Sequence, residues 1–172
     1  MSGPDFAILG LPRSGTTWAA NWLSDGSAIC LHDPEQDHAP EDILRLNLGR
    51  SFGISSSGLW AWPDVIARLE CPVLILDRDP GESDASMQRL GLDPLPSWAH
   101  DRFAGIKGLR VPHEWLWRVG GARAIWNYLR AGKEFDVLRW RELARVRVEP
   151  VIEKIRLCDG TRAAMRSIQQ GV

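Results

Sequence analysis

The feature that most constrains the fold is a glycine-bounded loop near the N-terminus. Residues 6–11, Phe-Ala-Ile-Leu-Gly-Leu, are apolar and predict a buried strand. Gly10 and Gly15 bound the loop that follows, and residues 16–23 have helical character. A loop that is curled by glycines at the start of a helix directs backbone N–H groups at an anion. The sequence therefore predicts a strand, an anion-binding loop and a helix in succession.

Further apolar runs alternate with helical segments along the chain. We expect strands at 28–31, 72–77 and 135–140, and a weaker strand or a helix end at 146–148. The predicted helices cover 40–48, 62–69, 82–90, 114–119, 122–129 and 161–169, with helix and loop in 94–108. The Gly- and Ser-rich residues 49–58 are predicted to form a loop. This alternation indicates one α/β domain over residues 1–172, with a mainly parallel central sheet.

Charge is distributed unevenly along the chain. Residues 1–100 carry 6 Lys and Arg against 14 Asp and Glu, whereas residues 101–172 carry 15 against 8. Either the acidic first part and the basic second part attract each other within one domain, or a basic surface of the second part faces an anionic ligand. Of the 21 cations 18 are Arg, whose planar guanidinium suits phosphate and sulfate oxygens. The net charge of −1 and the lack of cationic runs argue against nucleic-acid binding.

Several other classes of protein are also disfavoured by composition. No apolar run approaches the ~18 residues that a membrane span needs, and residues 1–5 lack the cationic start of a signal peptide. The three cysteines are an odd number without CxxC spacing, which argues against a disulfide framework or a zinc site. We therefore expect a cytoplasmic protein. Most of the nine Trp residues are expected to lie in the core or in pocket walls.

The loop differs from an ATP-binding Walker A motif, which would place Lys at position 16. Thr16 stands there, and the loop's cation is Arg13. Residues 12–18, Pro-Arg-Ser-Gly-Thr-Thr-Trp, resemble the 5′-phosphosulfate loop of sulfotransferases that use 3′-phosphoadenosine 5′-phosphosulfate (PAPS). In that family the loop has the pattern P-[KR]-S-G-T-T, often followed by W.

A second motif supports the resemblance independently. Arg78 follows the strand predicted at 72–77, and Ser86 lies eight residues beyond it. In the sulfotransferases an Arg and a Ser at this spacing bind the 3′-phosphate of the ligand. The two motifs cover roughly residues 5–90. The family's late glycine-rich loop is not recognisable, and Ile106-Lys107-Gly108 is at best a remnant of it.

The resemblance implies a P-loop NTPase-like three-layer α/β sandwich and in-line sulfuryl transfer from PAPS. Arg13 would stabilise the leaving phosphate, while Trp18 would stack on adenine or, alternatively, pack in the core. The other residues expected to bind PAPS are Ser14, Gly15, Thr16, Thr17, Arg78 and Ser86. A hydroxyl acceptor needs a general base, and the candidates are, in order, His32, Asp33 and Glu35. No metal requirement is implied.

The acceptor is expected to be a hydroxyl or amine on a small molecule, a glycan or a peptide. Two alternatives remain open. The first is a P-loop nucleotide kinase or hydrolase, in which Asp77, at the end of a predicted strand, would take the place of a Walker B aspartate. The second is a non-catalytic relative that binds nucleotides or 3′-phosphoadenosine 5′-phosphate (PAP), the desulfated product. Nothing in the sequence indicates an oligomeric state.

Overall fold

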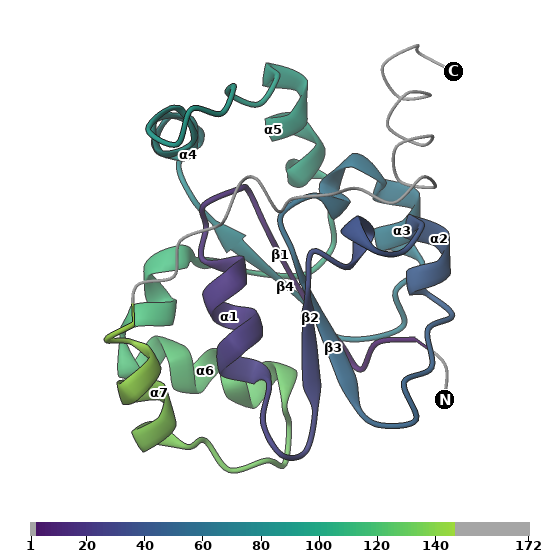
Figure 1. The fold of residues 1–172 in the computed structure, drawn as a ribbon, viewed down its shortest axis with the longest axis vertical. Helices are drawn as coiled ribbons and strands as arrows, with labels where there is room; N and C mark the ends of the chain where they lie inside the picture. The colour runs from purple at the N-terminus through teal and green to yellow at the C-terminus, as the bar shows by residue number, and fades with distance from the viewer. Residues whose placement is uncertain (1–2, 147–172) are drawn as a thin grey trace.

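The structure of the chain is a computed structural model, which describes residues 3–146 apart from the side chains of His100 and Phe103. Five strands form one sheet, with every pair of neighbours parallel and the order β2-β3-β1-β4-β5 (Figure 1). The strands are β1 Phe6–Gly10, β2 Ile29–His32, β3 Phe52–Ser56, β4 Val73–Asp77 and β5 Leu109–Pro112. The predicted α/β architecture with a parallel sheet is confirmed.

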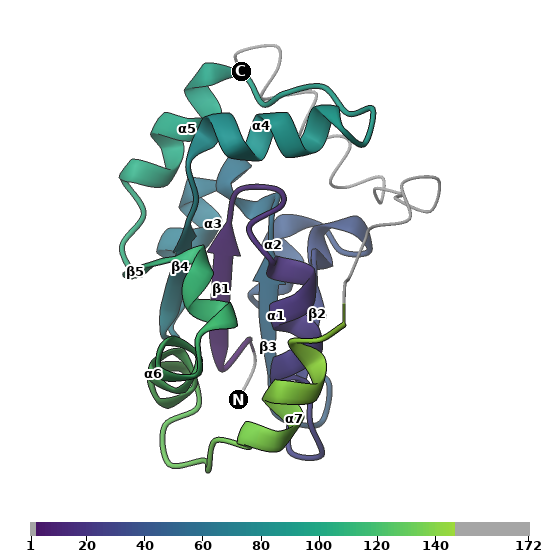
Figure 2. The same ribbon diagram turned by 90° about the vertical axis from the view of Figure 1, so that its left-hand side faces the viewer.

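Helices cover both faces of the sheet. On one face lie α1 Thr16–Leu23, the 3₁₀ helix η3 His113–Trp117, α6 Val119–Leu129 and α7 Val137–Leu143. On the other lie α2 Pro40–Ile43, the 3₁₀ helix η2 Leu59–Ala61 and α3 Pro63–Ala67. Two further helices, α4 Pro80–Gln88 and α5 Ser97–Ala104, lie beyond the carboxyl ends of the strands (Figure 2). A short 3₁₀ helix, η1 Pro34–Gln36, follows β2.

The central strand β1 shows why its sequence is apolar without interruption. All five of its residues are buried. Phe6 and Ile8 belong to the core beneath α1 and α6, whereas Ala7 and Leu9 belong to the core beneath α2 and α3. A parallel strand that is covered on both faces needs apolar residues at every position. The first predicted strand is therefore confirmed, with its end at Gly10.

The segment predicted as a loop at 49–58 contains strand β3, so that prediction is wrong. Its small residues are required by packing. A Cβ on Gly53 would lie 2.1 Å from the Phe6 ring, and the buried Ser55 donates its hydroxyl to the Thr16 carbonyl at 2.8 Å. Gly53 thus leaves room for the Phe6 ring of β1, and Ser55 bonds the start of α1 to the sheet. The Gly and Ser content of this segment suggested a loop. Composition does not show that these residues are small because neighbouring segments pack against them.

The strand predicted at 135–140 is also wrong, because α7 begins there. Asp136 caps this helix by accepting from the amides of Leu138 at 3.0 Å and Arg139 at 2.9 Å. Trp140, whose indole donates to the Leu116 carbonyl at 2.9 Å, packs into the core from the helix. The helix predicted at 40–48 is shorter and ends at Ile43. The predicted helix at 161–169 and most of the candidate strand at 146–148 lie outside the described residues.

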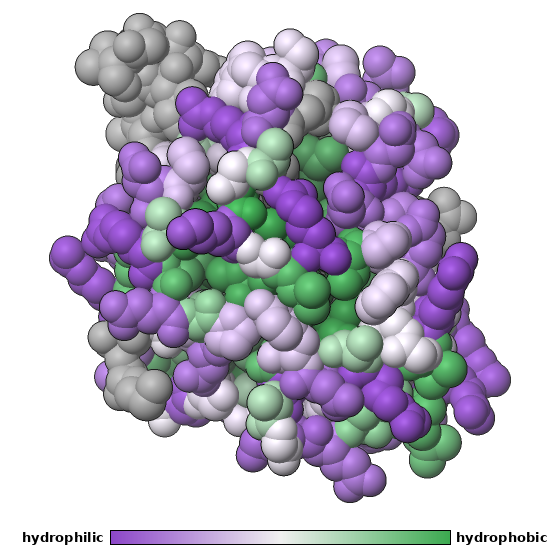
Figure 3. Space-filling model, turned by 180° about the vertical axis from the view of Figure 1, so that it is seen from behind, coloured by the Kyte–Doolittle hydropathy of each residue, from purple (hydrophilic) through white to green (hydrophobic). Residues whose placement is uncertain are grey.

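The edge strand β5 was not predicted, because only Val111 of its four residues is buried. Leu109 in this strand is 40% exposed. Seen from behind, the molecule shows a band of apolar residues bordered by hydrophilic ones (Figure 3). Within residues 3–146, no helix is long and apolar enough to cross a membrane.

Candidate functional site

The carboxyl ends of the parallel strands bring the predicted site residues to one edge of the sheet. The anion loop follows β1, His32 ends β2, and Arg78 directly follows β4. Ligands of open α/β sheets bind outside the carboxyl ends of the strands, where the strand order reverses. The central strand β1 lies at that reversal, because β2 and β3 are on one side of it and β4 and β5 on the other.

The loop backbone is folded in an unusual conformation. Arg13 has φ 70° and Gly15 has φ 91°, both in the left-handed region. Gly15 tolerates this angle, but a Cβ there would also lie 2.8 Å from Leu116 Cδ1 in η3. The Ser14 amide donates to the Leu11 carbonyl at 3.1 Å. The predicted glycine-bounded turn into α1 is therefore confirmed in its geometry.

The N-terminus of α1 leaves donors unpaired. The first bond of the helix runs from the Ala19 amide to the Gly15 carbonyl at 2.9 Å. Within residues 3–146, the amides of Gly15, Thr16, Thr17 and Trp18 have no backbone or side-chain acceptor. The Ser14 hydroxyl is buried, and in the described part of the chain it also lacks a hydrogen-bond partner. These donors, at the positive end of a helix, form an arrangement that suits an anion.

The two predicted motifs meet at this loop. Arg13 Nε donates to Ser86 Oγ in α4 at 3.2 Å, although the two residues are 73 positions apart. Arg78 Nη1 donates to the Arg13 carbonyl, and Arg78 Nε lies 3.7 Å from Glu82 Oε2. The structure therefore gathers two guanidinium groups and a buried serine hydroxyl around one loop.

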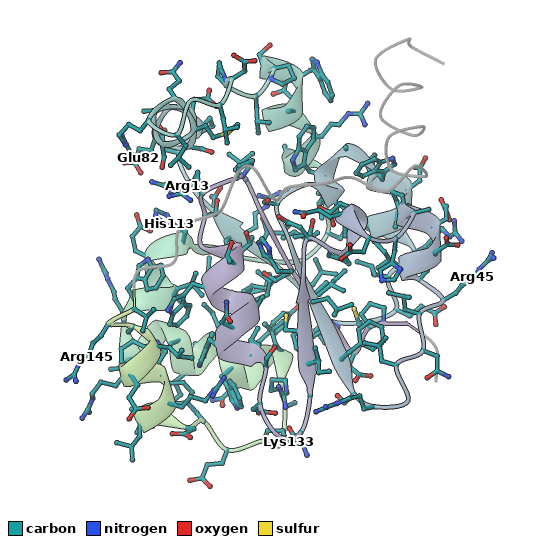
Figure 4. The ribbon with its side chains drawn as sticks, in the orientation of Figure 1. Arg13, Arg45, Glu82, His113, Lys133 and Arg145 are labelled. Carbon is teal, nitrogen blue, oxygen red and sulfur yellow. The ribbon has the colours of Figure 1, made fainter. Side chains whose placement is uncertain are left out.

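The same edge of the sheet carries acidic and basic groups around the motif. Asp79 caps α4 through the Glu82 amide at 3.0 Å, and Asp77 is exposed. Pro112 pairs with Asp77, so His113 follows β5 at the position where Arg78 follows β4. Arg13, Glu82 and His113 lie near one another in the view of Figure 4. His113 was not singled out from the sequence, because nothing local connects it with the loop.

His32, the first candidate base, contacts the loop's helix directly. Its Nε2 lies 2.9 Å from Thr17 Oγ1 and 3.4 Å from Asp33 Oδ2. Burial lowers the pKa of His32, and the Asp33 charge opposes that shift in part. The side chain remains 30% exposed. His32 is therefore a partly exposed imidazole beside the loop, with a pKa below its ordinary value.

The other two candidate bases are more enclosed. Asp33 Oδ1 accepts from the Ser57 amide at 2.6 Å. Glu35 is only 3% exposed, and its Oε1 accepts from the Ser56 hydroxyl at 2.6 Å. Burial, and after it the Asp33 charge, raise the pKa of Glu35 to about 7. Exposure thus favours His32 as the group that an acceptor can reach.

Trp18 lies in the core. It is 2% exposed, and its indole N–H donates to the Leu143 carbonyl at 2.9 Å. Its ring contacts Trp22 and Trp117, with centroids 5.4 and 4.7 Å away. Of the two roles that the sequence left open, adenine stacking and core packing, the structure places Trp18 in the second.

Two serines that contact the loop were missed by the sequence analysis. Ser83 in α4 donates to the Pro12 carbonyl at 2.6 Å, and Ser55 in β3 donates to the Thr16 carbonyl at 2.8 Å. Ser83 precedes Ser86 by three positions and therefore shares its helix face. That spacing is a signal from which Ser83 could have been found. Ser55 carried no such signal, because its segment was assigned to a loop.

No group of three or more His, Cys, Asp or Glu in residues 3–146 is arranged to bind a metal ion. Comparison of the chain with protein-family models, with curated proteins and with solved structures found no match. The function is therefore inferred from the geometry and chemistry of the site and from the resemblance of its two sequence motifs.

Proposed function

We propose that the chain transfers a sulfuryl group from PAPS to an acceptor hydroxyl or amine. The observation that carries this proposal is the hydrogen bond between Arg13 and Ser86. It joins the loop that resembles a 5′-phosphosulfate site to the motif that resembles a 3′-phosphate site. A ligand with anionic groups at both positions would meet donors from both motifs.

The donor set fits such a ligand. The unpaired amides at the start of α1 and the buried Ser14 hydroxyl suit the 5′-phosphosulfate. Arg78 and Ser86 suit the 3′-phosphate, which a guanidinium binds with charge-assisted hydrogen bonds. Arg13 supplies positive charge beside the bridging oxygen, where negative charge develops as the bond to sulfur breaks.

The transfer needs a base for the acceptor's proton. His32 Nε2 lies 2.9 Å from Thr17 Oγ1 and 3.4 Å from Asp33 Oδ2, and in the tautomer with its proton on Nε2 the ring keeps a lone pair on Nδ1. The acceptor oxygen or nitrogen would form its bond to sulfur while the bond from sulfur to the 5′-phosphate oxygen breaks. His32 would take the acceptor's proton, and PAP would leave.

The proposed site differs from that of an ATP-dependent enzyme at one position. Thr16, which stands where a Walker A loop has Lys, is 4% exposed, and its hydroxyl lies 3.4 Å from His32 Nε2. At this position the loop therefore lacks the lysine with which a Walker A loop reaches the terminal phosphates of ATP. A cytoplasmic setting is part of the proposal and accords with the free thiols of Cys30 and Cys71.

Calorimetric titration with PAP, AMP and ATP tests the proposal. We expect PAP to bind at least tenfold more tightly than AMP or ATP, because Arg78 and Ser86 favour a 3′-phosphate. Tighter binding of ATP would instead support a kinase or hydrolase. PAP binding without transfer from PAPS to any of a panel of phenols, sugars, amines and tyrosine peptides would support a non-catalytic protein.

The base is tested separately by His32→Ala. PAP affinity is expected to stay within a few-fold of wild type, while turnover falls by about 10²-fold or more and the pH dependence of the rate changes. A variant with an unchanged pH profile would transfer the role to Asp33 or Glu35.

A further inference from the structure

The backbone of the anion loop is tied to the β4–α4 unit at two successive carbonyls. Ser83 Oγ donates to the Pro12 carbonyl at 2.6 Å, and Arg78 Nη1 donates to the next carbonyl, that of Arg13. Ser83 is fully buried. It lies one helical turn before Ser86, whose hydroxyl accepts from the Arg13 side chain.

These bonds enclose the strained residue of the loop. Arg13 has φ 70°, a left-handed conformation that is unfavourable for a non-glycine residue. Such a conformation persists where the surroundings over-determine it. The peptide unit before Arg13 is held through the Pro12 carbonyl, and the unit after it through the Arg13 carbonyl. The Ser14 amide of that second unit is also bonded, to Leu11.

The Ser83 bond also determines the direction of an amide. In a trans peptide the C=O and the following N–H point to opposite sides, and no described peptide bond is cis. With its carbonyl bonded to Ser83, the Pro12–Arg13 peptide therefore points the Arg13 N–H away from α4. Without that bond the peptide can rotate and Arg13 can relax to negative φ.

We propose that Ser83 is a positioning residue of the anion loop. It would act through the loop backbone, by keeping Arg13 in the left-handed conformation that turns the loop's amides to the ligand. The inference deepens the proposed function and rests on one part of it, that the loop binds an anion. It does not depend on the chemistry of sulfuryl transfer.

A matched control lies at the other end of α1. Ser24 Oγ donates to the Ala20 carbonyl at 2.9 Å and accepts from the Cys30 amide at 2.8 Å, so Ser24→Ala removes a bond from a serine hydroxyl to a carbonyl, and one further bond, far from the loop. In the test, Ser83→Ala, Ser83→Thr and Ser24→Ala are compared with wild type. Each protein is titrated by calorimetry with PAP and with inorganic pyrophosphate, and its thermal unfolding is recorded.

We expect Ser83→Ala to weaken the binding of both anions about tenfold. Ser83→Thr, which keeps the hydroxyl, should restore most of that affinity, and Ser24→Ala should change it less than twofold. If Ser83→Ala acted only by lowering stability, Ser24→Ala should lower stability and anion affinity in the same way. Wild-type anion affinity in Ser83→Ala would overturn the inference.

Hydrogen exchange without any ligand separates this inference from the proposed function. The Ser14 amide, bonded within the loop, should exchange faster in Ser83→Ala than in wild type or Ser24→Ala. If wild-type protein binds neither PAP nor pyrophosphate, the proposed function fails. Exchange at Ser14 then decides alone whether Ser83 positions the loop, and an unchanged rate refutes it.

Discussion

The two ends of α1 are treated in opposite ways by the rest of the molecule. At the C-terminal end, side chains from the same face of the sheet and from the helix itself take the carbonyl oxygens. The bonds run from Arg130 to Leu23 at 2.9 Å, from Arg139 to Asn21 at 2.9 Å and from Ser24 to Ala20 at 2.9 Å. At the N-terminal end, the amides of Gly15 to Trp18 have no acceptor among the described residues.

Every α-helix leaves several amides and carbonyls unpaired at its ends, and burial makes them costly unless something bonds them. At the C-terminal end of α1, carbonyls are bonded by the buried Arg130 and the partly exposed Arg139, whose charges also suit the negative end of the helix dipole. At the N-terminal end the Pro12 and Arg13 carbonyls are bonded, whereas the amides of Gly15 to Trp18 have no acceptor among the described residues. The difference marks the end at which a ligand, and not the protein, is expected to supply the missing partner.

The largest effect is expected at the N-terminal end of α1, from Arg13→Ala. Arg13 is proposed to meet the charge that develops on the leaving phosphate, so its removal should affect the transition state more than the bound state. We expect turnover with PAPS to fall by about 10²-fold or more, while PAP affinity falls by less. Steady-state kinetics with an identified acceptor measure the turnover, and calorimetry measures the PAP affinity. Turnover within a few-fold of wild type would refute the mechanism.

A substitution at the C-terminal end of α1 should lower the stability of the protein without changing its affinity for PAP. Arg130→Met removes the bond to Leu23, an ion pair with Asp25 at 3.3 Å and a contact with the Trp126 ring at 5.1 Å. We expect the free energy of unfolding to fall by about 2–3 kcal/mol, because buried polar groups lose their partner. Urea unfolding followed by circular dichroism measures this loss. PAP affinity that fell in parallel would show that the two ends are not independent.

Arg78→Ala tests whether Arg78, beside the N-terminal end of α1, binds the 3′-phosphate or only supports the loop backbone. A charged hydrogen bond contributes ~1.5–3 kcal/mol, so PAP affinity should fall about 10- to 100-fold. Affinity for AMP should fall less, because AMP lacks the 3′-phosphate that Arg78 is proposed to bind. Calorimetry with both nucleotides gives the ratio. Equal losses for PAP and AMP would assign Arg78 to the support of the loop backbone alone.

The smallest effect is expected in the pH dependence of stability, through His32 beside the N-terminal end of α1. Burial lowers the pKa of His32 below its ordinary value of 6.5, so the unfolded chain binds a proton more readily than the folded one. The stability that neutral His32 contributes is therefore present above about pH 6.5 and is lost as the pH falls below it. His32→Gln should flatten this part of the curve of unfolding free energy against pH. A wild-type slope in the variant would contradict the assignment.

Local patterns predicted the parts of the molecule that depend on neighbours in sequence. The apolar run of β1, the glycine-bounded loop and the start of α1 follow from residues 6–23 and were predicted correctly. Their contacts involve short spans of chain and strong local preferences. Strand β4 was predicted for the same reason, since four of its five residues are buried.

Other elements could be recognised only once the sheet was assembled. Gly53 leaves room for the Phe6 ring of the neighbouring strand β1, and Ser55 bonds to Thr16 at the start of α1. Both are contacts between segments more than 30 residues apart. Residues 135–140 are apolar enough for a strand, yet the Asp136 cap and the packing of Trp140 make them part of α7. In both places tertiary contacts override a weak local preference.

Residues that are neighbours in the sequence were enough to predict the glycine-bounded loop, Arg13 within it, and the strand ends that carry His32 and Arg78. Which side chains surround that loop depends on tertiary contacts. The tertiary structure joined Arg13 to Ser86, brought Ser83 to the Pro12 carbonyl and put Trp18 into the core. The physical reason is that a loop's conformation depends on a few residues in succession, whereas its partners depend on how helices and strands pack, which no local pattern specifies.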